Sequence, residues 1–184
     1  MIRWIVLVLV LMMISSSVFA AGKVKSTFRI ISQSFKSGQR IPATYTCKGG
    51  NNSPEIHWKD APPQTKSFAL IVEDPDAPLQ VWTHWMIYNI PMKKPGPGAN
   101  VYELTEAYPR DEVTTGGILQ GLNDFRKIGY DGPCPPSGIH RYYFKLYALN
   151  SLLSVGAGLT KEQLWAVMKG HILAETQVVG TYGQ

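Results

Sequence analysis

Two strand-like segments without an intervening helix restrict the fold more than any other feature of this sequence. Residues 67–72 (SFALIV) form an almost continuous apolar run, which is typical of a strand buried on both faces. Residues 82–90 (WTHWMIYNI) form a second long strand-like run, and the connection between the two contains prolines but no helical pattern. Parallel strands are joined by crossovers that are usually helices. The sequence therefore argues against a parallel, Rossmann-type sheet.

Five further segments are short, rich in β-branched or aromatic residues and bounded by turn residues, as strands are. They are residues 25–34, 41–47, 55–58, 141–149 and 177–182. Thr160 and Gln163 form a capping box, and apolar residues then recur at helical spacing, which predicts a helix over residues 161–174. Residues 99–138 contain much Gly and Pro and little periodicity, a kind of stretch that is often functional. This pattern predicts a mainly β (α+β) domain of antiparallel strands with one late helix.

Residues 1–20 have the pattern of a secretory signal peptide. Arg3 supplies a positive charge, residues 5–14 are an unbroken apolar run, and small residues lead up to Ala20. The alternative is a membrane anchor, but the apolar run is shorter than the ~20 residues that a spanning helix needs. We therefore expect cleavage near Ala20 and an exported protein, periplasmic or secreted. Residues 21–184 would form one domain with no stable membrane insertion.

The charge of the chain is too modest to indicate a nucleic-acid partner. The formal net charge is +5, and the Lys and Arg residues are scattered without a basic run. This distribution supports a mild preference for anionic partners and nothing more specific.

The chain has two cysteines, Cys47 and Cys134. An exported protein with only two can pair them, and an oxidising compartment would keep them paired. A disulfide between positions so far apart would close a long loop and stabilise the fold by at most ~4 kcal/mol. The alternative is two buried free thiols, and spacing alone cannot establish the geometry of a bond. We expect the disulfide.

Three short clusters carry the polar residues of interest. Residues 74–78 (DPDAP) follow the first buried strand, and their two prolines fix the backbone that holds two carboxylates. Residues 82–85 (WTHW) place a histidine within an aromatic strand. Residues 129–144 (GYDGPCPPSGIHRYYF) form a Gly/Pro loop that leads into a strand carrying His140 and Tyr142. Because these two residues are two positions apart, their side chains share one face of that strand.

The chemistry of these clusters suits an anion. Imidazole and phenol groups are adjustable hydrogen-bond donors, and a nearby carboxylate orients an imidazole and favours its charged form. Two histidines around a Gly/Pro-lined concavity would therefore suit a phosphate or a carboxylate. Each residue also has a simpler explanation, since strand histidines are usually hydrogen-bonded core residues and Asp-Pro pairs are often only turns.

Catalysis is an alternative to binding. Asp74, His84 and His140 could arrange acid–base chemistry or a hydrolytic metal site. The sequence has no G-x-S-x-G elbow and no H-E-x-x-H motif, and a disulfide would remove Cys134 as a thiol nucleophile. Nothing in the spacing of the two histidines and the aspartate demands zinc. We therefore expect a protein with no catalytic residues, no metal ion and no cofactor.

Taken together, the motifs resemble those of the phosphatidylethanolamine-binding protein family, most closely its bacterial branch described as Raf-kinase-inhibitor-like. The matching segments are Tyr45–Cys47, Asn51–Pro54, Asp74–Pro78, His84–Trp85, Asn89–Pro91, Asn123–Phe125, Gly129–Phe144 and Gly170–Ala174. Each motif alone is only moderately specific for the family. Their shared order and spacing, over nearly the whole chain after residue 20, are strong evidence for the resemblance.

The resemblance implies a compact fold of two antiparallel β-sheets with Greek-key elements and a C-terminal helix. It also implies a pocket that accepts phosphate headgroups and other small anions. By motif position, the ligand-binding residues would be Asp74, Asp76, Pro78, His84, Pro136, His140 and Tyr142. The family often has a cis peptide in the first of these segments, which makes the Ala77–Pro78 bond a candidate.

The functional expectation is an exported protein that binds a small anion or a phospholipid headgroup and could act on an unknown protein partner. Two departures bear on the ligand and the rim of the pocket: Val81 stands where some relatives have an acidic residue, and Arg126 stands where bacterial relatives often have glycine. Some members of the family inhibit kinases, but an exported protein would not meet a cytoplasmic kinase of its own cell. The alternatives are a secreted inhibitor of a protease or other enzyme, a hydrolase that uses the His/Asp pocket, and a partner-directed factor with a vestigial pocket.

Overall fold

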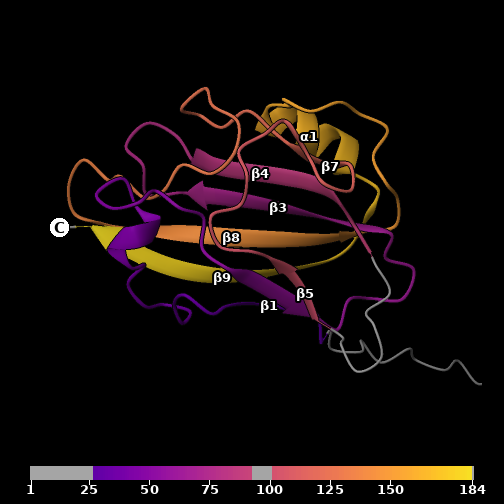
Figure 1. The fold of residues 1–184 in the computed structure, drawn as a ribbon, viewed down its shortest axis with the longest axis horizontal. Coiled ribbons are helices and arrows are strands. Elements are labelled where there is room, and N and C mark those ends of the chain that lie inside the picture. Colours follow the sequence, from indigo (N-terminus) through magenta and orange to yellow (C-terminus); the bar gives the residue numbers. More distant parts are fainter. Residues whose placement is uncertain (1–26, 93–100, 184) are drawn as a thin grey trace, which may run out of the picture.

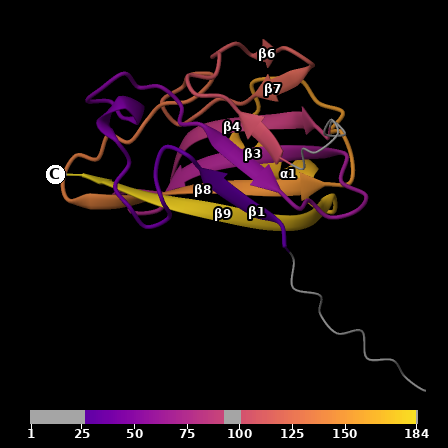
Figure 2. The same ribbon diagram turned by 60° about the horizontal axis from the view of Figure 1, so that its bottom comes forward.

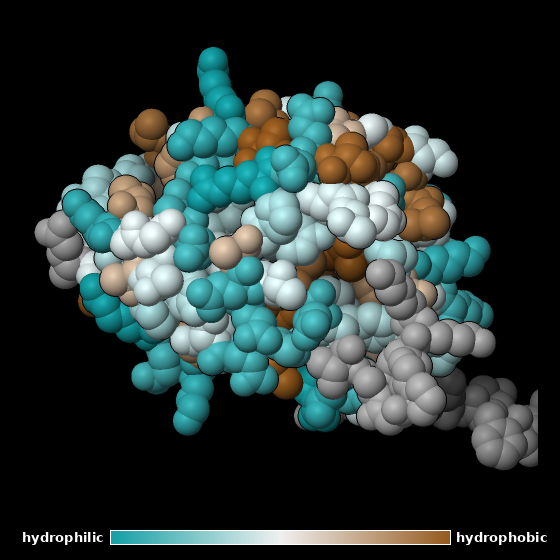
Figure 3. Space-filling model, in the orientation of Figure 1, coloured by the Kyte–Doolittle hydropathy of each residue, from teal (hydrophilic) through white to brown (hydrophobic). Residues whose placement is uncertain are grey.

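The structure, a computed structural model, describes residues 27–92 and 101–183 (Figure 1). The predicted signal peptide lies outside the described residues. Within the described ranges, no helix is long and apolar enough to cross a membrane. Polar side chains cover most of the face shown in Figure 3, with smaller groups of hydrophobic side chains among them.

Two antiparallel sheets make up the fold, one of six strands in the order β6-β7-β4-β3-β8-β9 and one of three in the order β1-β2-β5. The strands are β1 Arg29–Ser32, β2 Ile56–Lys59, β3 Ser67–Asp74, β4 Trp82–Pro91, β5 Val101–Leu104, β6 Val113–Thr114, β7 Ile118–Gln120, β8 Ile139–Leu149 and β9 Ile172–Gly183. Strands β3, β4 and β7 lie side by side, and β8 returns to the free side of β3, which is the Greek-key order. The predicted fold class is confirmed.

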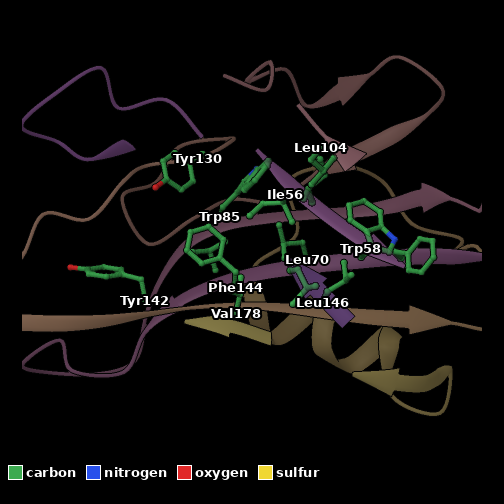
Figure 4. Close-up of a cluster of buried hydrophobic side chains, with 14 of the residues drawn as sticks. Ile56, Trp58, Leu70, Trp85, Leu104, Tyr130, Tyr142, Phe144, Leu146 and Val178 are labelled. Atoms are coloured by element: carbon green, nitrogen blue, oxygen red, sulfur yellow. The ribbon is translucent and has the colours of Figure 1, made fainter. Parts of the chain in front are cut away.

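Strand β3 is buried along its whole length because both of its faces are covered. Phe68, Leu70 and Val72 point into a core between the two sheets. In Figure 4, Ile56 of the small sheet faces Leu70 across this core. Ala69 and Ile71 point the other way, into a second cluster beneath the helix α1 (Figures 1 and 2). The alternation explains why the apolar run in β3 is continuous.

Helix α1, Lys161–Met168, is shorter than predicted. It begins as expected, with the hydroxyl of Thr160 accepting from the N–H of Gln163 and the Gln163 side chain accepting from the N–H of Thr160. It ends early because Gly170 adopts a φ of 88°, a left-handed conformation that stops a helix. The apolar residues 172–174, predicted to be helical, instead begin β9.

Two other segments differ from the sequence-based expectation. Residues 41–47, predicted to be extended, contain the 3₁₀ helix η1, Ala43–Tyr45, because Pro42 begins a turn and accepts the N–H of Tyr45. Residues 99–138 were expected to be irregular, but their described part includes β5, β6 and β7. The predicted disulfide is present: Cys47 and Cys134 are bonded, with Cα atoms 5.4 Å apart. It ties the segment after η1 to the loop before β8.

Candidate functional site

A cavity of about 210 Å³ lies where β3 ends and where β4 and β8 begin. Its lining residues are Asp74, Ala77, Pro78, Trp82, His84, Phe125, Cys134, Pro135, Pro136, His140 and Tyr142. Antiparallel pairing brings these strand ends together, since Asp74 at the end of β3 pairs with Trp82 of β4, and the preceding Glu73 pairs with Tyr143 of β8 (Figure 1). The structure thus gathers all three polar clusters at one end of the large sheet.

His84 is buried, with 3% of its surface exposed, and its ring orientation is fixed. Nδ1 lies 2.6 Å from the backbone carbonyl oxygen of Asp131. Because a carbonyl can only accept, Nδ1 carries a proton, and Nε2 is the nitrogen left for a pocket ligand. Burial lowers the pKa of His84, which favours the neutral imidazole when the pocket holds no anion.

His140 is held by a buried carboxylate. Its Nδ1 lies 2.7 Å from Oδ2 of Asp74, while Oδ1 of Asp74 accepts the N–H of Asp76 at 2.9 Å. One carboxylate therefore orients the imidazole and also closes the turn that follows β3. As in His84, Nε2 is the ring nitrogen that remains for a ligand.

Two hydrogen-bond donors in the cavity wall have no partner. Four buried polar side-chain atoms in the described part of the chain lack a hydrogen bond, and two of them, Tyr142 Oη and Trp82 Nε1, belong to lining residues. Figure 4 shows the Tyr142 hydroxyl pointing away from the hydrophobic cluster beside it. Burial, with the Asp74 carboxylate nearby, raises the pKa of Tyr142, so its hydroxyl stays protonated and able to donate. Buried donors without partners are uncommon and point to a missing acceptor.

Asp76 does not line the cavity, unlike the other six residues predicted to bind a ligand. Its carboxylate accepts from Arg141 three times, from the backbone N–H at 2.9 Å, from Nε at 2.8 Å and from Nη2 at 2.6 Å. These bonds lower the pKa of Asp76 to about 2. Asp76 therefore fastens the turn after β3 to β8 next to His140, and we assign it a positioning role. The Ala77–Pro78 peptide is trans, contrary to the expectation of a cis bond.

The aromatic wall of the cavity was missed from the sequence. The ring centroid of Phe125 lies 5.3 Å from that of His84 and 5.4 Å from that of Trp82. The ring of Tyr142 also contacts His84, with ring centroids 5.2 Å apart. Phe125 is positioned by Asn123, whose side-chain oxygen accepts the N–H of Phe125 at 3.0 Å. The Asn-Asp-Phe motif marked Phe125 as part of the family pattern. The contact of Phe125 with β4 depends on the tertiary fold and could not be predicted from the motif.

Fold and site together define a two-sheet β protein with a small pocket lined by histidine, proline and aromatic residues. The sequence model of the family described as "Phosphatidylethanolamine-binding protein" matches residues 31–183, and the chain belongs to this family.

Relatives of similar length support this assignment. The chain is 47% identical over 148 residues to a UPF0098 protein of Methanothermobacter thermautotrophicus, covering 80% of this chain and 93% of the relative. It is 42% identical over 175 residues to a UPF0098 protein of Aquifex aeolicus, covering 93% and 96% of the two chains.

Solved structures agree with these sequence matches. A phosphatidylethanolamine-binding protein homologue from Chlamydia trachomatis has a TM-score of 0.74 and 40% identity, covering 87% of this chain and 99% of its own. YbcL of E. coli, described as a member of the mammalian family, has a TM-score of 0.74 and 32% identity, covering 85% and 98% of the two chains. The predicted family is confirmed.

Proposed function

We propose that this protein is a binding protein whose pocket takes a small anion, either free phosphate or the phosphate group of a lipid headgroup. The observation that carries the proposal is the pair of buried, unpartnered donors in the cavity wall, Tyr142 Oη and Trp82 Nε1. Together with the free Nε2 atoms of His84 and His140, they offer four polar atoms to one oxyanion. The cavity of about 210 Å³ has room for roughly seven water molecules, below the usual range for drug-sized ligands.

The charges of the pocket set the conditions for binding. Among the described lining residues there is no Lys or Arg, and Asp74 contributes a carboxylate. Burial lowers the pKa of His84 in the free pocket, and a bound anion favours the charged imidazole, so binding takes up a proton and becomes tighter as the pH falls.

A second cavity, of about 290 Å³, lies on the outer face of β3 and β8 beside α1 and contains two lysines. It suits an anion less well because both lysines are already paired. Glu73 accepts from Lys145 at 2.6 Å and lies 3.2 Å from Lys161. The histidine pocket is therefore the better candidate.

A hydrolase is less well supported than a binding protein. Cys134 is in a disulfide and cannot act as a thiol nucleophile. The described lining residues include no Ser or Thr, and the raised pKa of Tyr142 makes its hydroxyl a poor nucleophile. Release of phosphate from phosphoethanolamine by the protein, lost on His140→Ala, would favour the hydrolase instead.

We also propose that the protein is exported, on the basis of the signal-peptide pattern in residues 1–20. In a periplasmic or extracellular setting the pocket would meet free anions, lipid headgroups and protein partners. Inhibition of a secreted enzyme through the pocket rim remains the second candidate function, supported by the resemblance of the chain to a family that includes inhibitors.

The binding proposal is tested by calorimetric titration with inorganic phosphate and with phosphoethanolamine. Tyr142→Phe removes one oxygen atom and should weaken binding about tenfold, since a hydrogen bond to a charged group contributes about 1.5–3 kcal/mol. Tyr143→Phe is the matched control because Tyr143 neighbours Tyr142 on β8 and does not line the pocket. Equal binding by both variants, or no binding by the unmodified protein, would overturn the proposal. Tighter binding of phosphoethanolamine than of phosphate would favour a lipid headgroup.

A further inference from the structure

A second group of polar side chains lies on the three-stranded sheet and does not line the pocket. In β2, Ile56 and Trp58 are 0% and 1% exposed and point into the core. Because side chains alternate along a strand, Glu55 and His57 project from the opposite face of the sheet. Figure 2 turns this sheet toward the viewer.

The neighbouring strand β5 adds a carboxylate to the same face. Glu103 is the Cα partner of His57 in the antiparallel pair of β2 with β5. The next pair along, Trp58 and Tyr102, stacks on the core side with ring centroids 5.9 Å apart. Glu103 therefore points outward with His57, and directly opposed residues bring their side chains close together.

Glu55, His57 and Glu103 each offer one ligand atom, and these three atoms lie within 4.8 Å of one another. Over the described ranges, this is the one group of three such side chains that could hold a metal ion. Asp74, His84 and His140 do not form such a group, although the sequence left that arrangement open. His57 Nε2 already faces the carboxylate of Glu55, as it must if both are to bind one ion.

We propose that these three residues form a binding site for a zinc ion. Zinc prefers tetrahedral coordination by imidazole and carboxylate groups at about 2.0–2.2 Å, which places ligand atoms roughly 3.3 Å apart. The three atoms lie within 4.8 Å of one another, so each pair would have to approach by at most about 1.5 Å to reach this spacing. Two carboxylates balance the charge of the ion, and the fourth position faces solvent because Glu103 is exposed. Calcium and magnesium fit less well because they prefer oxygen ligands only.

The site would join β5 to the centre of its sheet. β5 has four residues and pairs with β2 alone, which makes it an edge strand. An ion held by side chains on both strands cross-links them and opposes local opening of the edge. We therefore expect zinc to bind at this sheet and to stabilise the pairing of β5 with β2, and not to bind in the anion pocket.

The test is calorimetric zinc titration of the metal-free protein in a buffer that does not chelate zinc. We expect one ion per chain, with affinity reduced at least roughly tenfold by His57→Ala and by Glu103→Gln. Glu103→Gln keeps the shape of an exposed side chain, so it tests the site even if His57→Ala folds poorly. Glu112→Gln is the control, because Glu112 is exposed and its side chain is outside the cluster.

Amide hydrogen exchange gives a second measurement. Zinc should slow exchange in β5 of the unmodified protein and leave exchange in Glu103→Gln unchanged. Zinc binding that survives Glu103→Gln but is lost in the double variant His84→Ala/His140→Ala would place the ion in the pocket and overturn the proposal. No binding by the unmodified protein at a concentration well above that of the protein would also overturn it.

Discussion

The imidazole Nδ1 of His140 lies 2.7 Å from Oδ2 of Asp74, although the two residues are 66 positions apart in the chain. Both side chains are buried, with Asp74 3% and His140 8% exposed. Pairing of the end of β3 with the beginning of β8 produces this contact, so formation of the large sheet also assembles the pocket.

Asp74→Ala should destabilise the protein by about 2 kcal/mol, because it leaves the Nδ1 of His140 and the N–H of Asp76 without their acceptor. Urea denaturation measures this loss. Asp111→Ala is the control, because Asp111 is exposed and does not line the pocket. An equal effect of the two substitutions would show that the contact with His140 contributes nothing specific.

Tyr142→Phe should have opposite effects on stability and on binding. The hydroxyl of Tyr142 is buried without a partner, so its removal should raise the free energy of unfolding by about 1 kcal/mol. The same substitution should weaken phosphate binding, because it removes a hydrogen-bond donor from the cavity wall. Thermal or urea denaturation of the anion-free protein tests the first effect. A loss of stability in Tyr142→Phe would mean that the hydroxyl already has an acceptor in the protein.

Sulfate binding should become tighter as the pH falls from about 8 to about 5.5, the range in which histidines titrate. Burial lowers the pKa of His84, so the free pocket holds a neutral imidazole at neutral pH. A bound dianion favours the charged form, and proton uptake on binding follows from this linkage. Sulfate is a useful probe because its own charge does not change in this range.

The His84→Gln variant should show a smaller dependence of sulfate affinity on pH than the unmodified protein. His171→Gln is the control, because His171 pairs with Asn150 outside the pocket. Calorimetry over a pH series measures both. A sulfate affinity that does not change with pH in the unmodified protein would contradict protonation of His84 on binding.

The ion pair between Asp76 and Arg141 should make stability depend on pH in acid. The pKa of Asp76 falls from its ordinary value of 3.8 to about 2, mainly through its hydrogen bond with Arg141. A lowered pKa means that the contribution to stability is present above pH 3.8 and is lost as the pH falls toward 2. Arg141→Gln should remove this part of the acid dependence and return the Asp76 pKa toward 3.8, which NMR titration of the carboxyl group measures. An unchanged Asp76 pKa in this variant would exclude the ion pair as the cause.

Much of the fold was predictable because its strongest signals are local. The run 67–72 is continuous because β3 has a core on each face, and the capping box of Thr160 marks the start of α1. The end of α1 was misjudged because Ile172 continues the helical spacing of apolar residues. Only the conformation of Gly170 decides that the chain turns there into β9.

The site was predictable in part, where motif order located the histidines and prolines. Asp76 was expected in the pocket by its position in the family motif, whereas in the structure its carboxylate pairs with Arg141 and does not line the cavity. Trp82 and Phe125 were missed because nothing in the local sequence shows that an aromatic residue next to a motif lines a cavity. Their places in the cavity wall follow from the packing of two distant segments around His84.

The most direct test of the anion pocket is NMR titration of the isotope-labelled protein with inorganic phosphate. We predict shifts of backbone amides confined to residues 74–78, His84 and residues 135–142, saturating with a single binding curve. Absence of shifts in these segments would contradict anion binding in this pocket, as would shifts centred on Lys145, Lys161 and α1, which line the cavity beside the helix.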